Sequence, residues 1–192
     1  MLLFIAGLVI FLGVHSVAIV APAWREAQIA QRGALAWRGL YSVVSILGFA
    51  LLIYGYGVAR HEPLQLYTPP PWLRHFALVL MLPVFPLLLA AYLPGRIKTA
   101  AKQHPMLLAV KIWATAHLLA NGTLVDVLLF GSFLGWAVLD RISAKRRTVL
   151  RQVPGAPPSR FNDAIALGGG LALYALFLMG GHRWLTGVSP LG

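Results

Sequence analysis

The sequence predicts an all-α protein, a polytopic membrane bundle of six transmembrane helices with both termini outside. Hydrophobic residues make up 59% of the 192 residues and charged residues 11%. The mean hydropathy is +0.76. This composition is typical of multi-span membrane proteins. A third observation, the alternation of basic and uncharged loops between apolar runs, sets the orientation.

The apolar runs divide a single membrane domain, residues 1–192, into six spans. The first has no Lys or Arg before it and no small-residue cleavage pattern after it, which favours a membrane span over a signal peptide. Pro83 and Pro86 predict a kink in the third span. Asn162 is the expected N-cap of the sixth. The predicted spans are residues 2–21, 40–59, 73–93, 106–121, 123–139 and 164–181, with a polar helical connector after the first.

Basic residues fall mainly in alternate loops. The loops after the first, third and fifth spans hold twelve Lys and Arg, the other loops and the tail hold three, and Lys111 lies inside the fourth span. Cytoplasmic loops are enriched in Lys and Arg, so the loops after the first, third and fifth spans are placed in the cytoplasm. We expect Arg141–Arg151 to contact anionic phospholipids there. Because the charge follows membrane topology, we expect no nucleic-acid partner.

The fourth and fifth spans form a hairpin that contains strongly polar residues. Lys111, His117, Asn121 and Asp126 stand where a structural hairpin would have Leu or Ala. Such residues are costly in hydrocarbon and usually face a bundle interior or a pathway. The hairpin is therefore the predicted functional region. The chain has no cysteine, which excludes disulfides, thiolate nucleophiles and Cys-ligated metal sites.

Two histidines, His15 and His117, lie within apolar spans. Imidazoles from two helices of a bundle are suitable axial ligands for haem iron. Without a Cys-x-x-Cys-His motif, the haem would be of b type. The alternative is that both rings are structural and bond to helix backbone. Trp113, His117 and Asn121 share one helix face, whereas Lys111 points elsewhere.

The depths of these histidines complicate their pairing. His15 lies about 10 Å from the cytoplasmic end of the first span, and His117 about 20 Å along the fourth span from His104. His104, which opens the fourth span before Pro105, is therefore the reserve ligand. His61, His75 and His182 are assigned to the outer surface, away from the haem.

Several separated motifs resemble the NnrU family of bacterial inner-membrane proteins, which is linked with denitrification. The similar region covers residues 1–150. It includes Gly13-Val14-His15-Ser16, Ala21-Pro22-Ala23-Trp24-Arg25, Trp37-Arg38-Gly39-Leu40-Tyr41-Ser42, Pro94-Gly95-Arg96-Ile97-Lys98, His104-Pro105-Met106, Ala116-His117-Leu118-Leu119-Ala120-Asn121-Gly122 and Phe130-Gly131-Ser132-Phe133.

The resemblance implies a haem b cofactor. A related branch is 15-cis-zeta-carotene isomerase, a haem b protein acting on a membrane polyene, and its ligating histidines match His15 and His117. That branch has a cysteine near the second histidine, which this chain lacks, so the resemblance supports haem more than isomerisation. By their charge and depth alone, the candidates to bind the haem propionates are Arg25, Arg38, Lys98 and Lys111.

The function expected from the resemblance is a haem b membrane protein of NnrU type. It would act in nitrogen-oxide metabolism or in redox-linked isomerisation of a membrane lipid such as a carotenoid. Its partner would be a membrane lipid or another hydrophobic small molecule; catalytic residues and any redox partner are not identified. The alternatives are a membrane methyltransferase and a transporter or accessory subunit of a nitrogen-oxide reductase. The methyltransferase is disfavoured because a basic run follows Asp140, where such enzymes need an acidic pair.

Overall fold

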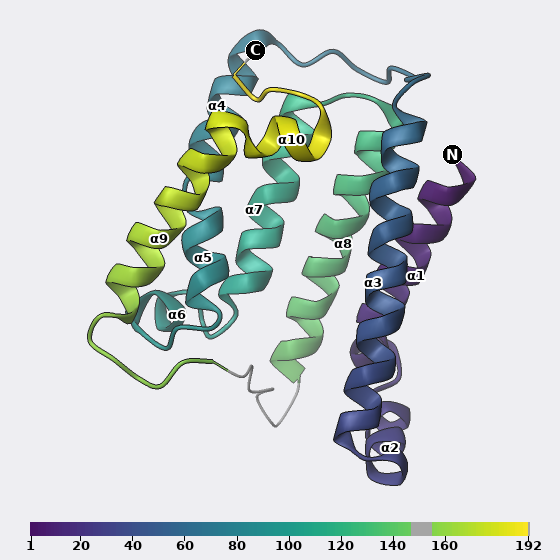
Figure 1. The fold of residues 1–192 in the computed structure, drawn as a ribbon, viewed down its shortest axis with the longest axis vertical. Coiled ribbons are helices and arrows are strands. Elements are labelled where there is room, and N and C mark those ends of the chain that lie inside the picture. The colour runs from purple at the N-terminus through teal and green to yellow at the C-terminus, as the bar shows by residue number, and fades with distance from the viewer. Residues whose placement is uncertain (147–154, 192) are drawn as a thin grey trace. The chain divides into compact units, whose positions relative to one another are not determined.

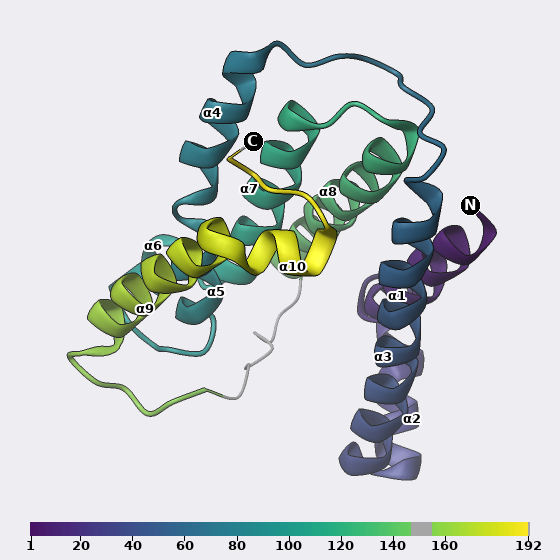
Figure 2. The same cartoon turned by 45° about the horizontal axis from the view of Figure 1, so that its top comes forward.

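The computed structural model describes residues 1–146 and 155–191, and these residues are helical with no strand beyond one isolated bridge. The chain divides into two compact units, Met1–Leu64 and Gln65–Gly192 (Figures 1 and 2). The predicted all-α class is therefore confirmed for the described residues.

The first unit is a long helical hairpin. It contains α1 (Leu2–Val20), α2 (Pro22–Arg32) and α3 (Ala34–Ala59). A Cβ added at Gly7 would overlap the backbone of Leu52, so α1 and α3 meet backbone to backbone there. Small residues permit this close approach in membrane helix pairs. Gly13, by contrast, faces open space.

The second unit is organised around α7 (Pro105–Ala120). This helix packs against α8 (Leu124–Arg146), α4 (Pro71–Met81) and α5 (Val84–Ala90), and α5 in turn contacts α9 (Asn162–Leu176). The short α6 (Arg96–Ala100) connects α5 to α7 (Figure 1). Val84 and Leu87 of α5 and Ala109 of α7 form the buried centre of this packing.

Two of the predicted spans change direction along their length. The third is broken between Met81 and Val84, as Pro83 and Pro86 predicted. In the sixth, α9 continues into a π-helical turn, η1 (Phe177–Gly181), where Gly180 leaves the helical conformation. A last short helix, α10 (His182–Thr186), then lies across the end of α7 (Figure 1).

Five of the predicted spans are long and apolar enough to cross a membrane. They are α1, α3, Pro71–Ala90, α8 and Asn162–Thr186, whereas α7 is a shorter apolar helix of 16 residues. At 1.5 Å per residue α7 measures about 24 Å, less than the ~30 Å of a bilayer core. The chain is a membrane protein; six crossings and the orientation of the termini remain predictions.

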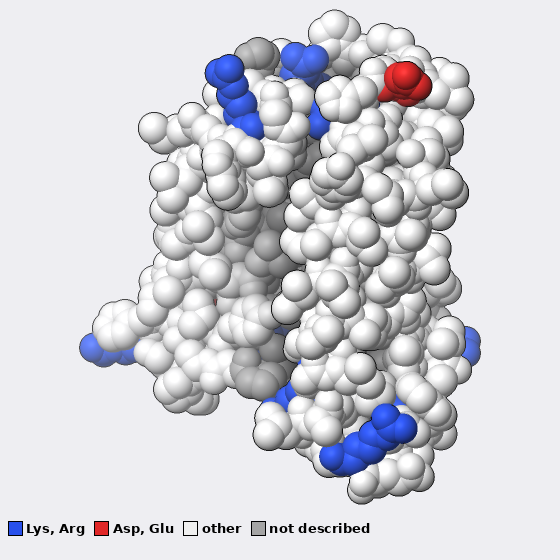
Figure 3. Space-filling model, turned by 45° about the vertical axis from the view of Figure 1, so that its right-hand side comes forward, with Lys and Arg blue, Asp and Glu red and all other residues white. Residues whose placement is uncertain are grey.

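The surface fits a membrane environment. Large apolar side chains such as Val9, Ile46 and Val79 are exposed. On the face in Figure 3, Lys and Arg gather near the two ends of the helices and the surface between them is uncharged. Of the basic segment Arg141–Arg151, the part to Arg146 lies in the last turns of α8, and the remainder lies outside the described residues.

The prediction that Asn162 caps the sixth span is wrong. Phe161 is the N-cap, and Asn162 is the first helical residue. The Asn162 Nδ2 donates to the carbonyl oxygens of Pro94 at 2.8 Å and Pro157 at 3.1 Å. The neighbouring Asp163 accepts from the backbone N–H of Arg96 and of Ile97. Both side chains therefore fasten the start of α9 to the loop before α6.

Candidate functional site

The turn between α7 and α8 is closed by side chains of the hairpin itself. The backbone N–H of Asp126 donates to Thr123 Oγ1 at 3.3 Å, and the backbone N–H of Thr123 donates to Asp126 Oδ2 at 3.4 Å. Thr123 Oγ1 also donates to Asp126 Oδ2 at 2.6 Å. This reciprocal arrangement is a capping box at the start of α8. Asn121 Nδ2 donates to the His117 carbonyl at 2.9 Å. Asp126 therefore has a structural role that its position in an apolar run did not reveal.

The loop before α4 holds the same turn from outside the hairpin. The backbone N–H groups of Leu66 and Tyr67 both donate to the Gly122 carbonyl. The Tyr67 hydroxyl reaches the carbonyl oxygens of Leu118 and Asn121. These are last-turn carbonyls that lack partners within α7. Tyr67 therefore fixes the end of the helix that carries His117.

His117 lies one turn before the end of α7. Its Nδ1 is 2.8 Å from the Trp113 carbonyl oxygen. A carbonyl only accepts, so in the neutral ring Nδ1 carries the proton and Nε2 has the free lone pair. The ring also stacks on Phe130, with centroids 4.5 Å apart. The orientation and tautomer of His117 are therefore both fixed by α7 and α8.

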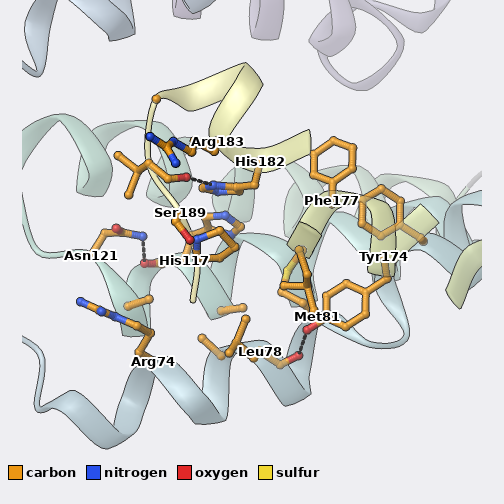
Figure 4. A pocket seen from close by; sticks show the side chains of 18 residues that line it. Arg74, Leu78, Met81, His117, Asn121, Tyr174, Phe177, His182, Arg183 and Ser189 are labelled. Carbon is orange, nitrogen blue, oxygen red and sulfur yellow. Dashed lines mark hydrogen bonds between the residues drawn. The ribbon is translucent and has the colours of Figure 1, made fainter. Parts of the chain in front are cut away.

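A second histidine, His182, faces His117. The two ring centroids are 6.3 Å apart and the ring planes differ by 23° (Figure 4). His182 Nδ1 is 2.7 Å from the Val188 carbonyl oxygen, which again leaves the Nε2 lone pair available. The chain reaches Val188 through Gly187, whose φ of 78° ends α10 in the left-handed conformation that favours glycine.

A cavity of about 610 Å³ opens beside these two rings. Arg74, Arg183 and Asn121 lie on one side of it, and Phe177 and Tyr174 lie on the other (Figure 4). A second cavity of about 250 Å³ adjoins it, because both are lined by His117 and His182. The lining residues of the larger cavity are Arg74, Ala77, Leu78, Met81, Phe85, Ala116, His117, Ala120, Asn121, Tyr174, Phe177, Leu178, His182, Arg183, Gly187, Val188, Ser189 and Pro190.

The elements that build the cavity come from three parts of the second unit. Arg74 and Leu78 lie on α4, and the Leu78 carbonyl accepts a 2.7 Å hydrogen bond from the Tyr174 hydroxyl of α9. This bond joins the third and sixth predicted spans beside the cavity. After the turn at Gly180, α10 contributes His182 and Arg183 to the cavity wall. The site is therefore apolar and aromatic inside, with two imidazoles and two guanidinium groups at its walls.

The predicted site residues are only partly brought together. His117 and Asn121 line the larger cavity, and Trp113 lines the smaller one. The expected propionate ligands do not line either cavity. Arg25 and Arg38 belong to the first unit. Lys98 donates to the Ala91 carbonyl, and Lys111 lies on α7 outside both cavity linings. His104 is the N-cap of α7, at the end of the helix remote from His117.

His15 belongs to the first unit. Its Nδ1 is 2.7 Å from the Phe11 carbonyl oxygen, and its ring lies between Phe11 and Tyr41, at centroid distances of 4.3 and 5.2 Å. It thus shares the backbone anchoring of His117 in a different unit. His61 and His75 are exposed and do not line the cavities.

Three cavity residues were missed as site candidates: Arg74, His182 and Arg183. All three lie at predicted span ends, where charged and polar side chains are ordinarily solvated. One feature of the sequence could have pointed to them: the predicted topology places all three residues on the same side of the membrane. In the described residues, no group of three or more His, Cys, Asp or Glu forms a metal cluster.

Comparison with known proteins supplies the family. The sequence profile described as "NnrU protein" matches residues 3–190. The chain belongs to the NnrU family. The match extends beyond residue 150, so the NnrU region includes α9, α10 and the cavity residues that they contribute. No curated protein and no solved structure matches the chain at a significant level.

Proposed function

We propose that this NnrU-family protein binds one haem b in the cavity beside His117 and acts in the bacterial inner membrane. The observation that carries the proposal is His117 itself. Its Nδ1 is held by the Trp113 carbonyl, and its ring forms part of the wall of a 610 Å³ cavity. Histidines that ligate metals commonly have the second ring nitrogen anchored in this way, which fixes the tautomer and the ring orientation.

The other lining residues suit a porphyrin. The cavity lies within the range of about 300–1,000 Å³ that is usual for small-molecule sites. Phe85, Phe177 and Tyr174 present aromatic surface to a flat apolar ligand. Arg74 and Arg183 provide guanidinium groups, which pair with carboxylates through two parallel hydrogen bonds. An amphipathic ligand with acid groups at one edge is therefore the class that fits.

Different cavity residues would bind different parts of such a ligand. His117 would bind the iron, Arg74 and Arg183 would neutralise the propionates, and the aromatic walls would exclude water. Bound haem supplies an iron that exchanges electrons or binds a small ligand. We place this activity in nitrogen-oxide metabolism or in redox-linked conversion of a membrane lipid. The resemblance implies His15 as the second ligand of the iron.

The test is the visible spectrum of the full-length protein purified from a haem-sufficient host. We expect about one haem b per chain, and His117→Ala should lose most of it or change its spin state. His75→Ala is the matched control, since this exposed histidine is not among the cavity residues. Wild-type protein that remains haem-free after reconstitution with hemin, or a His117→Ala variant with the unaltered wild-type spectrum, would overturn the proposal.

A further inference from the structure

The depth of each histidine in its helix bears on which pair can reach one iron. In the six-span topology predicted by the charge pattern, the first and fourth spans cross the membrane in opposite directions. His15 lies near the end of α1 and His117 near the end of α7. In that predicted topology, α1 would end at the cytoplasmic face and α7 at the outer face. The fourth and sixth spans, however, cross in the same direction, so the ends of α7 and of the α9–η1 segment approach the same face.

His182 stands at that shared face and in contact with the site. It follows the turn at Gly180, which redirects the chain toward α7. Its ring lies 6.3 Å from that of His117 in nearly parallel orientation, and both rings border both cavities.

The hydrogen bonds of His182 prepare it in the same way as those of His117. Each ring donates its Nδ1 proton to a backbone carbonyl, Trp113 for one and Val188 for the other. Each consequently presents a basic Nε2. Thr186 adds a second anchor, since its Oγ1 lies 3.1 Å from His182 Nδ1 and donates to the His182 carbonyl at 2.8 Å.

We infer that His182, rather than His15, is the second axial ligand of the iron, opposite His117. This inference rests on the proposed haem function and deepens it by naming the partner residue. Two imidazoles suffice for a haem iron because the porphyrin itself supplies the equatorial ligands. The site is then contained within residues 65–192, with Arg74 and Arg183 beside it to receive the acid groups. An ordinary packed histidine pair held by backbone carbonyls is the competing explanation, and the spectra of variants distinguish the two.

The experiment compares His182→Ala, His15→Ala and His75→Ala in the full-length protein. We expect wild type, His15→Ala and His75→Ala to show the same low-spin spectrum. His182→Ala should convert to a five-coordinate, high-spin spectrum, and added imidazole should restore the low-spin form by entering the vacated position. A merely structural role for His182 would not produce rescue by imidazole.

A second variant keeps the inference testable if the alanine protein does not accumulate. His182→Met retains a ligand, and exchange of His for Met at an axial position raises the reduction potential. We expect a low-spin haem with an upward-shifted midpoint potential. An unchanged spectrum and potential in the His182 variants would overturn the inference, and loss of the low-spin form in His15→Ala would assign the ligand to His15. Both results would leave the haem proposal standing, whereas a haem-free wild type would remove the proposal itself.

Discussion

At the residue scale, Tyr67 connects a surface loop to the helix that carries His117. Its hydroxyl bonds to the carbonyls of Leu118 and Asn121. Tyr67→Phe removes this donor, and a lost hydrogen bond of this kind costs about 1 kcal/mol. We expect a lower thermal unfolding midpoint in detergent, with Tyr92→Phe, an exposed tyrosine of the same unit, as control. Equal midpoints for the two variants would contradict this role.

The same hydroxyl predicts a pH dependence. Burial, and then the nearby charge of Asp126, raise the pKa of Tyr67 above its ordinary value of 10.0. A raised pKa means that folding favours the protonated phenol, which is the form that donates. Its contribution is therefore complete below the unfolded pKa and is lost as the pH rises through the folded pKa. The difference in unfolding midpoint between wild type and Tyr67→Phe should be constant at neutral pH and should shrink in strongly alkaline buffer.

The two arginines predict how tightly an acidic ligand is held. Arg74 and Arg183 are exposed on the cavity side, so each pairing is worth only about 1 kcal/mol, or roughly five-fold in affinity. Arg74→Gln with Arg183→Gln should therefore weaken hemin binding by more than ten-fold with an unchanged spin state. Arg60→Gln, at another predicted outer position, is the charge control. Equal affinity in the double variant and the control would remove the arginines from the site.

At the element scale, the pairing of α1 with α3 depends on small residues at defined positions. A Cβ at Gly7 would overlap the Leu52 backbone, whereas one at Gly13 would meet nothing within 4 Å. Overpacking at a tight contact costs about 1–3 kcal/mol. Gly7→Ala should lower the thermal stability of the purified protein, and Gly13→Ala on the same helix should not. The opposite order would contradict the observed packing.

The sequence predicted the elements well because their signals are local. Apolar length placed every span on a helix, and Pro83 correctly marked the break between α4 and α5. The ends were less accurate: α8 continues to Arg146, beyond the predicted end at residue 139. Basic residues interact favourably with the dipole at a helix C-terminus, so α8 can continue through its charged last turns. The end of its apolar run therefore does not mark the end of the helix.

At the scale of the whole molecule, the site was only half predicted. His117 and Asn121 were found because a polar residue in an apolar run is conspicuous. His182 and the two arginines were missed because their placement depends on tertiary structure, namely the non-helical conformation of Gly180 and the return of the chain at Gly187. Neither the period of hydrophobicity nor the charge count encodes those turns. Gly180-Gly181 before a histidine was the only local hint.

The last prediction concerns the orientation of the whole chain in the membrane. Twelve Lys and Arg fall in the loops after the first, third and fifth spans, against three on the other side. Cytoplasmic loops retain Lys and Arg, so a reporter fused after Arg147 should be active only as a cytoplasmic marker. A fusion after Gly192 should be active only as an external marker.

This orientation also decides where the cavity opens. Arg74, His117 and His182 lie toward the ends of their spans that the charge pattern places outside, so the cavity would be reached from the outer face. The chain has no cysteine. A Ser189→Cys variant therefore carries a single thiol that a membrane-impermeant maleimide can label. We expect Ser189→Cys to be labelled in intact spheroplasts and Lys102→Cys only after lysis. Labelling of Lys102→Cys alone in intact spheroplasts, or a cytoplasmic reporter signal from the fusion after Gly192, would reverse the orientation and place the cavity on the inner face.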